Sequence, residues 1–359
     1  MRDFIARLFR RPPDRPGRFE SGSKFSWNGW IRVAPWVWPS RDYLVYVPRG
    51  YTRWRRRPLL VLLHGCRQTP EDFAAGTRVV KFADDRGWLV LLPRQASHAN
   101  AWGCWNWFDR RTTAGKGEAA IVAAQIREVR RHYRAHPRQI FLAGMSAGAC
   151  LGAVLGLRFA GLFAAVGLHS GVACGAASSA AMALNAMSMG AQTDIDAVAF
   201  DARGETPSRA LPLPVCVVHG EHDQVVAEKN AGELLRQFLV FNGRSAPKAE
   251  RLPDPDLRST ARLANGRTMT TEDYLLGGRR VARRIRVSGL GHAWSGGDSA
   301  YAYNDPEPPD ATALFGEFFA AQLKRRIALG GRRDPDALQV QPETSDDRSS
   351  DESLHDSHR

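Results

Sequence analysis

Apolar runs that alternate with helical patterns constrain the fold of this chain more than any other feature. Such runs occur at residues 43–47, 59–63, 88–92, 139–142, 163–169 and 215–218. Segments with helical periodicity lie at about 71–85, 118–132, 228–239 and 312–329, and another follows residue 146. Because helices cover a parallel sheet on both faces, its strands are apolar throughout. The pattern predicts an α/β fold with a mostly parallel central sheet flanked by helices on both faces.

The 359 residues suit a single domain of this kind, expected over residues 40–329. Within it, the Ala- and Ser-rich segment 173–212 is a candidate lid or insertion, with ordinary helix packing as the alternative. Two β-like runs around Leu275 and Ile285 flank two glycines at 277–278, which predicts a hairpin near the sheet edge. The basic segment 1–39 is expected to be partly disordered, and the acidic tail 330–359 to be disordered.

Charge is distributed unevenly along the chain. The formal net charge is +13, but residues 334–359 hold eight carboxylates against two arginines, a charge of −6 that leaves +19 on the rest. An excess of basic over acidic residues is compatible with nucleic acid or anionic surfaces as partners. The arginines are nevertheless scattered, without a recognisable nucleic-acid-binding module, so no nucleic-acid partner is expected.

Two segments resemble membrane signals without meeting their requirements. The apolar stretch 141–157 has GxxxG spacing, but Arg158 ends it short of the ~20 residues that a span needs. We expect a buried helix packed closely on a sheet, and no transmembrane segment. Arginines interrupt the first eleven residues, so no cleavable signal peptide is expected.

The sharpest local motif is Gly144-Met-Ser-Ala-Gly148, which follows an apolar run and precedes a helix of small residues. It matches the G-x-S-x-G pattern, in which a serine lies on a strained turn between strand and helix. The turn leaves no room for side chains two positions away, and it directs the helix N-terminus toward the reacting carbonyl. We predict that Ser146 is a nucleophile rather than a structural serine.

A serine hydroxyl is a weak nucleophile until a base takes its proton. In α/β-hydrolases the order along the chain is serine, acid, histidine, with each partner on a loop after a later strand. Asp223 directly follows the run 215–218, and His292 lies in a glycine-flanked loop after the last β-like run. Glu221 is the alternative acid; we favour Asp223.

The negative charge that develops on a carbonyl oxygen requires preorganised donors. One donor is expected to be the backbone N–H of Ala147. The other comes, in this fold, from the loop after the strand at 59–63. We assign it to the backbone N–H of Cys66, whose thiol need not react.

Motifs for metals and nucleotides are incomplete. His132 and His136 have the i, i+4 spacing of zinc ligands, but Tyr133 stands where HExxH requires glutamate. The Gly-Lys pair at 115–116 is followed by glycine, so no P-loop is present. No metal or other cofactor is expected.

The chain resembles the poly(3-hydroxybutyrate) depolymerase family of esterases, which is related to feruloyl and acetylxylan esterases. The matching segments follow the family order across about residues 40–325, and they are Arg41–Pro48, Leu63–Gln68, Cys104–Phe108, Gly117–Glu118, Gly144–Gly148, His169–Gly171, His219–Asp223 and Gly291–Gly297.

This resemblance implies an α/β-hydrolase fold and a serine carboxylic-ester hydrolase that works through an acyl-enzyme. The family's catalytic triad carries over onto Ser146, Asp223 and His292. The implied substrates are polyhydroxyalkanoate (3-hydroxybutyrate) oligomers or similar short acyl esters. Extracellular members often carry a signal peptide and a polymer-binding domain, and neither is visible in this sequence, so soluble or oligomeric esters are expected rather than crystalline polymer.

The resemblance also suggests roles for other residues. Trp105 and Trp107 would line or brace the substrate cleft, with a place in the buried scaffold as the alternative. Trp294 is a further substrate-binding candidate. Cys66 and Cys104 lie in two matching segments, so a disulfide between them is a hypothesis.

Several alternatives stay open. A feruloyl or acetylxylan esterase, or another acyl hydrolase, would use the same triad. A remoter alternative is a non-catalytic binding protein that uses the basic body on anionic surfaces. Without a visible signal peptide a cytoplasmic location is favoured, and an extracellular one is the alternative because family members are often secreted. The oligomeric state is not predicted.

Overall fold

A computed structural model describes residues 16–29, 39–249 and 251–330, with side chains as far as Leu323. Contacts group residues up to Leu323 into one unit and the residues after it into another. The sheet and the candidate site belong to the first unit. The disorder expected for residues 1–15, 30–38 and 331–359 concerns positions outside the described residues.

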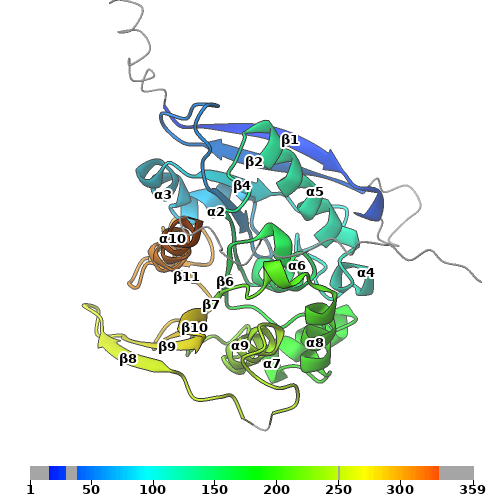
Figure 1. Cartoon of the computed structure of the whole chain (residues 1–359), viewed down its shortest axis with the longest axis vertical. Helices are drawn as coiled ribbons and strands as arrows, with labels where there is room; N and C mark the ends of the chain where they lie inside the picture. Colours follow the sequence, from blue (N-terminus) through cyan, green and yellow to red (C-terminus); the bar gives the residue numbers. More distant parts are fainter. Residues whose placement is uncertain (1–15, 30–38, 250, 331–359) are drawn as a thin grey trace, which may run out of the picture. The chain divides into compact units, whose positions relative to one another are not determined.

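Within the described residues, a ten-stranded sheet has the order β1-β2-β4-β3-β5-β6-β7-β10-β9-β8 (Figure 1). The six strands from β4 to β10 are mutually parallel. Antiparallel strands extend the sheet at both edges. The strands are β1 (Arg18–Phe25), β2 (Ser40–Val47), β3 (Leu59–Leu63), β4 (Leu89–Pro93), β5 (Ile140–Met145), β6 (Ala165–His169), β7 (Val215–Gly220), β8 (Leu257–Arg262), β9 (Thr268–Leu276) and β10 (Arg279–Val287). Two short strands, β11 (Trp294–Ser295) and β12 (Asn304–Asp305), pair separately.

Helices cover both faces of the sheet, so the predicted α/β-hydrolase architecture is confirmed (Figure 1). One face packs against α5, α6, α8 and α9, and the other against α2, α3 and α10. The helices are α2 (Pro70–Gly76), α3 (Val79–Arg86), α4 (Arg110–Thr113), α5 (Gly117–His132), α6 (Ala147–Arg158), α7 (Ala180–Met189), α8 (Ile195–Glu205), α9 (Lys229–Phe241) and α10 (Ala311–Gly330). Short 3-10 turns lie at Trp27–Gly29, Ala160–Leu162 and Ser208–Ala210.

The central strand β3 shows why its sequence is apolar throughout. Leu59, Val61 and Leu63 point into the core on the α5 and α6 side, whereas Leu60 and Leu62 point into the core on the other side. Side chains alternate between faces along a strand, so a strand covered on both faces needs apolar residues at every position. Each such burial stabilises the fold by about 1.5–3 kcal/mol.

Three boundaries differ from the sequence predictions. The helix expected over 71–85 is two helices, because Arg78 adopts a left-handed backbone (φ 55°) between α2 and α3. The sheet begins at β1, which pairs with β2, so the fold extends upstream of residue 40. Strand β8 was missed because all six of its residues are exposed and show no apolar alternation. The hairpin of β9 and β10 around Gly277 and Gly278 is confirmed.

The segment 173–212 forms two helices with different surroundings. Helix α8 contributes Ile195, Ala199 and Ala202 to the core and packs on α9. Helix α7 also buries Ala183 and Ala186 in the core, but it exposes Leu184 and Met189. Of these two helices, α7 contributes residues, Leu184 and Met187, to the cavity described below.

Candidate active site

Ser146 lies at the turn between β5 and α6, with φ 53° and ψ −124°. This is an unusual conformation for a residue other than glycine, and such strain persists where the surroundings impose it. The Ser146 N–H donates to the His169 carbonyl, 2.9 Å away across the parallel strands. Ala147 follows as the first residue of α6, where a backbone N–H has no acceptor within the helix.

Close backbone contacts explain the glycines of the motif. A Cβ on Gly144 would lie 2.6 Å from the Gly148 carbonyl oxygen, and a Cβ on Gly148 would lie 2.2 Å from the Leu63 carbonyl oxygen. The crowding expected around the turn is therefore confirmed.

Asp223 and His292 are brought together from loops that follow β7 and β10. Asp223 Oδ2 lies 2.8 Å from His292 Nδ1, while Asp223 Oδ1 accepts hydrogen bonds from the N–H groups of Val225 (3.0 Å) and Val226 (2.8 Å). Burial alone would raise the pKa of Asp223, but the hydrogen bond and charge of His292, together with the Val226 N–H, lower it to about 2. Asp223 is therefore an ionised carboxylate at neutral pH.

The alternative acid, Glu221, is oriented elsewhere. Its carboxylate lies 3.7 Å from the guanidinium of Arg286 and is partly exposed. The geometry therefore favours Asp223 over Glu221 as the partner of His292.

His219 contacts Asp223 and was not singled out from the sequence. Its Nε2 lies 2.8 Å from the Val226 carbonyl oxygen and 3.4 Å from Asp223 Oδ2. Burial lowers the pKa of this imidazole, so the neutral ring with a proton on Nε2 fits both contacts. The HGEHD segment could have indicated this role, because its first histidine directly precedes the loop of the acid.

A cavity of about 440 Å3 brings the predicted residues to one place. Ser146, His292 and Cys66 all line it. Within the part of the chain that the structure describes, the hydrogen bonds of His292 include Asp223 but not the Ser146 hydroxyl. Catalytic hydrogen bonds are often long before substrate binds, so this geometry is compatible with proton transfer in the substrate complex.

Cys66 lines the cavity, and its backbone N–H has no acceptor among the described residues. The N–H of Gly65 donates to Gln68 Oε1 (2.8 Å), and that of Arg67 donates to the Trp102 carbonyl (2.9 Å). Among the described residues, none accepts a hydrogen bond from the Cys66 N–H. The Cys66 N–H is thus a donor of this loop that remains available to a carbonyl oxygen.

The hypothesised disulfide between Cys66 and Cys104 is present, with 4.2 Å between the two Cα atoms. It ties the loop after β3 to the segment that precedes α4. The other three cysteines are buried thiols.

A buried carboxylate fixes the segment that carries Cys104. Glu118 accepts hydrogen bonds from the Asn106 N–H (2.7 Å) and from Gln95 Nε2 (2.6 Å), and it pairs with Arg41 at 3.5 Å. Gln95 Nε2 also donates to the Cys104 carbonyl at 2.8 Å. The charged members, Arg41 and Glu118, are almost completely buried. Buried charges are tolerated when they are paired and hydrogen-bonded, so this satisfied network holds the segment in place.

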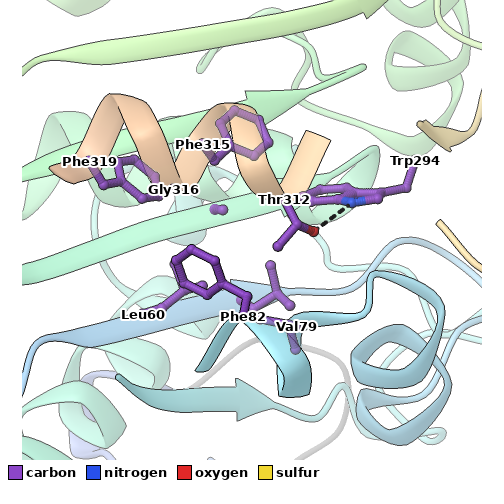
Figure 2. Close-up of a pocket in the computed structure, with 10 residues that line it drawn as sticks. Leu60, Val79, Phe82, Trp294, Thr312, Phe315, Gly316 and Phe319 are labelled. Carbon is purple, nitrogen blue, oxygen red and sulfur yellow. Dashed lines mark hydrogen bonds between the residues drawn. The ribbon is translucent and has the colours of Figure 1, made fainter. Parts of the chain in front are cut away.

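The three tryptophans proposed to contact substrate do not line the cavity, so the prediction that they line it was wrong. Trp105 is fully buried and donates to the His64 carbonyl at 3.1 Å; Trp107 is also in the core. Trp294 donates to Thr312 Oγ1 at 3.1 Å and borders a separate apolar void of about 10 Å3 between α3, α10 and the sheet (Figure 2). These large rings fill the scaffold, which was the stated alternative for Trp105 and Trp107.

Other side chains line the cavity instead. Leu184 and Met187 belong to the candidate lid segment 173–212, and the sequence analysis did not identify the rest as cavity residues. The aromatic ones are Trp102 and Tyr303, and the remaining apolar ones are Met145, Leu184, Met187 and Val225. They come from the end of β5, from loops and from α7, so no single pattern along the sequence could have identified all of them.

Neither a metal cluster nor a membrane span is found in the described part of the chain. No group of three or more His, Cys, Asp or Glu side chains there is arranged to hold a metal ion. None of its helices is both long and apolar enough to cross a bilayer.

Sequence comparisons identify proteins related to this chain. The model of the family described as "Esterase PHB depolymerase" matches residues 41–253. Poly(3-hydroxyalkanoate) depolymerase C of Paucimonas lemoignei is 30% identical over 201 residues, which cover 55% of this chain and 48% of that protein. Feruloyl esterase B of Neurospora crassa is 27% identical over 89 residues, or 25% of this chain and 30% of that protein. The chain thus spans half or less of the length of these relatives.

A solved structure extends the likeness to the fold. An acetyl xylan esterase from Aspergillus awamori has a TM-score of 0.59 at 20% identity, covering 76% of this chain and 94% of that one. The fold is shared, and the family match spans more than half of the sequence, including the turn at Ser146 and the acid loop at Asp223. The chain therefore belongs to the PHB depolymerase family of esterases.

Proposed function

We propose that this protein is a carboxylic ester hydrolase in which Ser146 is the nucleophile, His292 the general base and Asp223 the acid that orients it. The observation that carries the proposal is the 2.8 Å contact between Asp223 Oδ2 and His292 Nδ1 beside a cavity that Ser146 also lines. Membership of an esterase family supports the same reaction.

In the first half of the reaction, His292 Nε2 takes the proton of Ser146 Oγ as the oxygen attacks the ester carbonyl. Asp223 accepts the hydrogen bond from Nδ1, which keeps Nε2 free as a base and stabilises the imidazolium. The backbone N–H groups of Cys66 and Ala147 hold the oxyanion. His292 then donates its proton to the departing alcohol, and the acyl group remains on Ser146.

In the second half, water attacks the acyl-enzyme and His292 takes its proton. The tetrahedral intermediate again places its oxyanion between the N–H groups of Cys66 and Ala147. Collapse of this intermediate returns the proton to Ser146 Oγ and releases the carboxylic acid. Loss of one oxyanion donor typically costs about 10²–10³ in kcat, so both amides matter to the rate.

The cavity supports a short or medium-sized acyl ester as substrate. Most of its lining is apolar, and its volume suits a small molecule or the end of an oligomer. Oligomers of 3-hydroxyalkanoates are the first candidates, in keeping with the depolymerase relative.

A feruloyl or acetylxylan-type ester is the second candidate. The rings of Trp102 and Tyr303 line the cavity and provide faces on which an aromatic acyl group can stack. Rates on hydroxybutyrate oligomers, p-nitrophenyl butyrate, methyl ferulate and acetylated xylan oligomers would separate the candidates.

The test of the reaction itself is Ser146→Ala, measured with p-nitrophenyl butyrate. We expect kcat/KM to fall by at least about 10³-fold, because the residual catalysis of such mutants comes only from binding and the oxyanion donors. Ser259→Ala, on the exposed strand β8, is the matched control and should keep the wild-type rate. Full activity in the Ser146→Ala protein would overturn the assignment.

A further inference from the structure

Arg67 is the one permanently charged residue among the described side chains that line the cavity. No aspartate or glutamate lines it, and its other polar members are few. Gln68 is already engaged, since its Oε1 accepts from the Gly65 N–H and its Nε2 donates to the Ala302 carbonyl at 3.1 Å. The guanidinium is thus the strongest hydrogen-bond donor that this cavity offers to a ligand.

The structure fixes this arginine at the edge of the cavity. Its backbone is left-handed (φ 58°), and its N–H donates to the Trp102 carbonyl. Its guanidinium carbon lies 4.4 Å from the centre of the exposed Trp102 ring, a stacking contact that favours this orientation of the side chain. The preceding residue, Cys66, is tied down by the disulfide. Within the described chain, no carboxylate forms an ion pair with Arg67, so the charge remains available.

We propose that Arg67 binds the carboxylate of substrates that carry a free carboxylate close to the scissile ester. This inference rests on the proposed esterase function and names the substrate class of the same site. A single guanidinium presents two parallel N–H donors, which match the two oxygens of a carboxylate. A phosphate ester, with its greater charge, would call for a second cation, and no described lining residue supplies one.

Arg67 and the proposed nucleophile share one cavity. Arg67 directly follows Cys66, the proposed oxyanion donor, and both residues line the cavity together with Ser146. A substrate that reaches Arg67 and Ser146 at once therefore needs its carboxylate and its ester close together. In 3-acyloxyalkanoates, one methylene separates the carboxylate from the carbon that carries the ester oxygen, so these esters meet that requirement.

The experiment compares matched anionic and neutral esters. The alcohol-side pair is 3-(butyryloxy)butanoate and its primary amide; the acyl-side pair is mono-p-nitrophenyl glutarate and p-nitrophenyl pentanoate. We expect wild-type kcat/KM to favour the anion in at least one pair, chiefly through KM. Arg67→Gln should reduce that preference about tenfold, in line with a hydrogen-bonded charge pair, and Arg67→Lys should retain part of it.

Arg67→Gln replaces one residue that carries a Cβ with another, so the backbone strain of the left-handed conformation is the same in the variant and in the wild type. Arg262→Gln, on the exposed strand β8, removes the same charge far along the chain from the cavity and should leave the preference unchanged. If both substitutions lower the preference equally, overall charge is responsible and the proposal fails. It also fails if the wild type shows no preference in either pair while hydrolysing p-nitrophenyl butyrate. Absence of all ester hydrolysis would instead overturn the proposed function, and this inference with it.

Discussion

His292 Nδ1 lies 2.8 Å from Asp223 Oδ2, and the other oxygen of the same carboxylate is held by the N–H groups of Val225 and Val226. The carboxylate is therefore fixed at both ends before any substrate binds. This arrangement keeps the proton of His292 on Nδ1 and leaves Nε2 as the basic atom.

We expect Asp223→Asn to lower kcat by about 10³–10⁴-fold with little loss of folding stability. The new amide can keep its oxygen toward the Val225 and Val226 N–H groups and present its NH2 to His292. That orientation stabilises the wrong tautomer of the imidazole. Steady-state kinetics with p-nitrophenyl butyrate measure the effect.

Glu221→Gln is the control for this substitution, because Glu221 lies beside Arg286 and not beside His292. It should change kcat less than about threefold, since a partly exposed ion pair contributes little. A larger loss for Glu221→Gln than for Asp223→Asn would exchange the roles of the two acids.

Breaking the disulfide should weaken both stability and turnover. The bond closes a 38-residue separation between Cys66 and Cys104, and the chain-entropy model assigns such a loop about 4 kcal/mol. The Cys66→Ser/Cys104→Ser double variant should therefore unfold at lower urea concentration, with lower kcat because the Cys66 N–H is less firmly held. Reductant should weaken the wild type and have no effect on the double variant. A wild type that is insensitive to reductant, with both thiols free by mass spectrometry, would contradict the bond.

Two glycine substitutions test the close packing of α6. A Cβ at Gly148 would meet the Leu63 carbonyl oxygen at 2.2 Å, so Gly148→Ala should destabilise the fold by about 3 kcal/mol or abolish soluble expression. A Cβ at Gly204, in α8, would have nothing within 4 Å, and Gly204→Ala should stabilise by about 0.5 kcal/mol. Urea unfolding would measure both, and equal effects of the two would argue against this packing.

Stability should fall below pH 6.5 because of His64. Its Nδ1 donates to the Gly65 carbonyl and its Nε2 accepts from the Gln95 N–H, which requires the neutral ring. Burial lowers the pKa of His64 to about 4 from its ordinary value of 6.5. Between these pH values the unfolded chain binds a proton that the folded protein does not, so stability decreases as pH falls through this window.

Between pH 7 and pH 5, His64 should lower the free energy of unfolding by about 2 kcal/mol, because each pH unit between the two pKa values contributes ~1.4 kcal/mol. Urea unfolding at both pH values should show a smaller pH-dependent loss for His64→Asn than for the wild type. His98 is exposed, so the His98→Asn variant should lose as much stability between the two pH values as the wild type does. Equal losses for His64→Asn and the wild type would mean that His64 is not the group responsible.

Much of this protein follows from local sequence. Strand β3 is apolar at every position because both faces of the sheet are covered, so its burial was predictable from five residues. Gly144 reflects a close contact with Gly148 in the same turn, and the order of the proposed serine, acid and histidine follows the order of the strands. These features depend on periodicity and on backbone sterics, which neighbouring residues alone determine.

Tertiary structure decided the rest. A buried Trp105 and an exposed Trp102 are three residues apart, and only the packed fold assigns one to the scaffold and the other to the cavity. The choice of Asp223 over Glu221 depends on the directions in which one loop holds the two carboxylates. The Trp102 carbonyl, from a distant segment, accepts from the Arg67 N–H and leaves the neighbouring Cys66 N–H without an acceptor among the described residues. Such contacts join segments far apart in the chain, so their geometry is set by the whole fold and is not encoded in any local pattern.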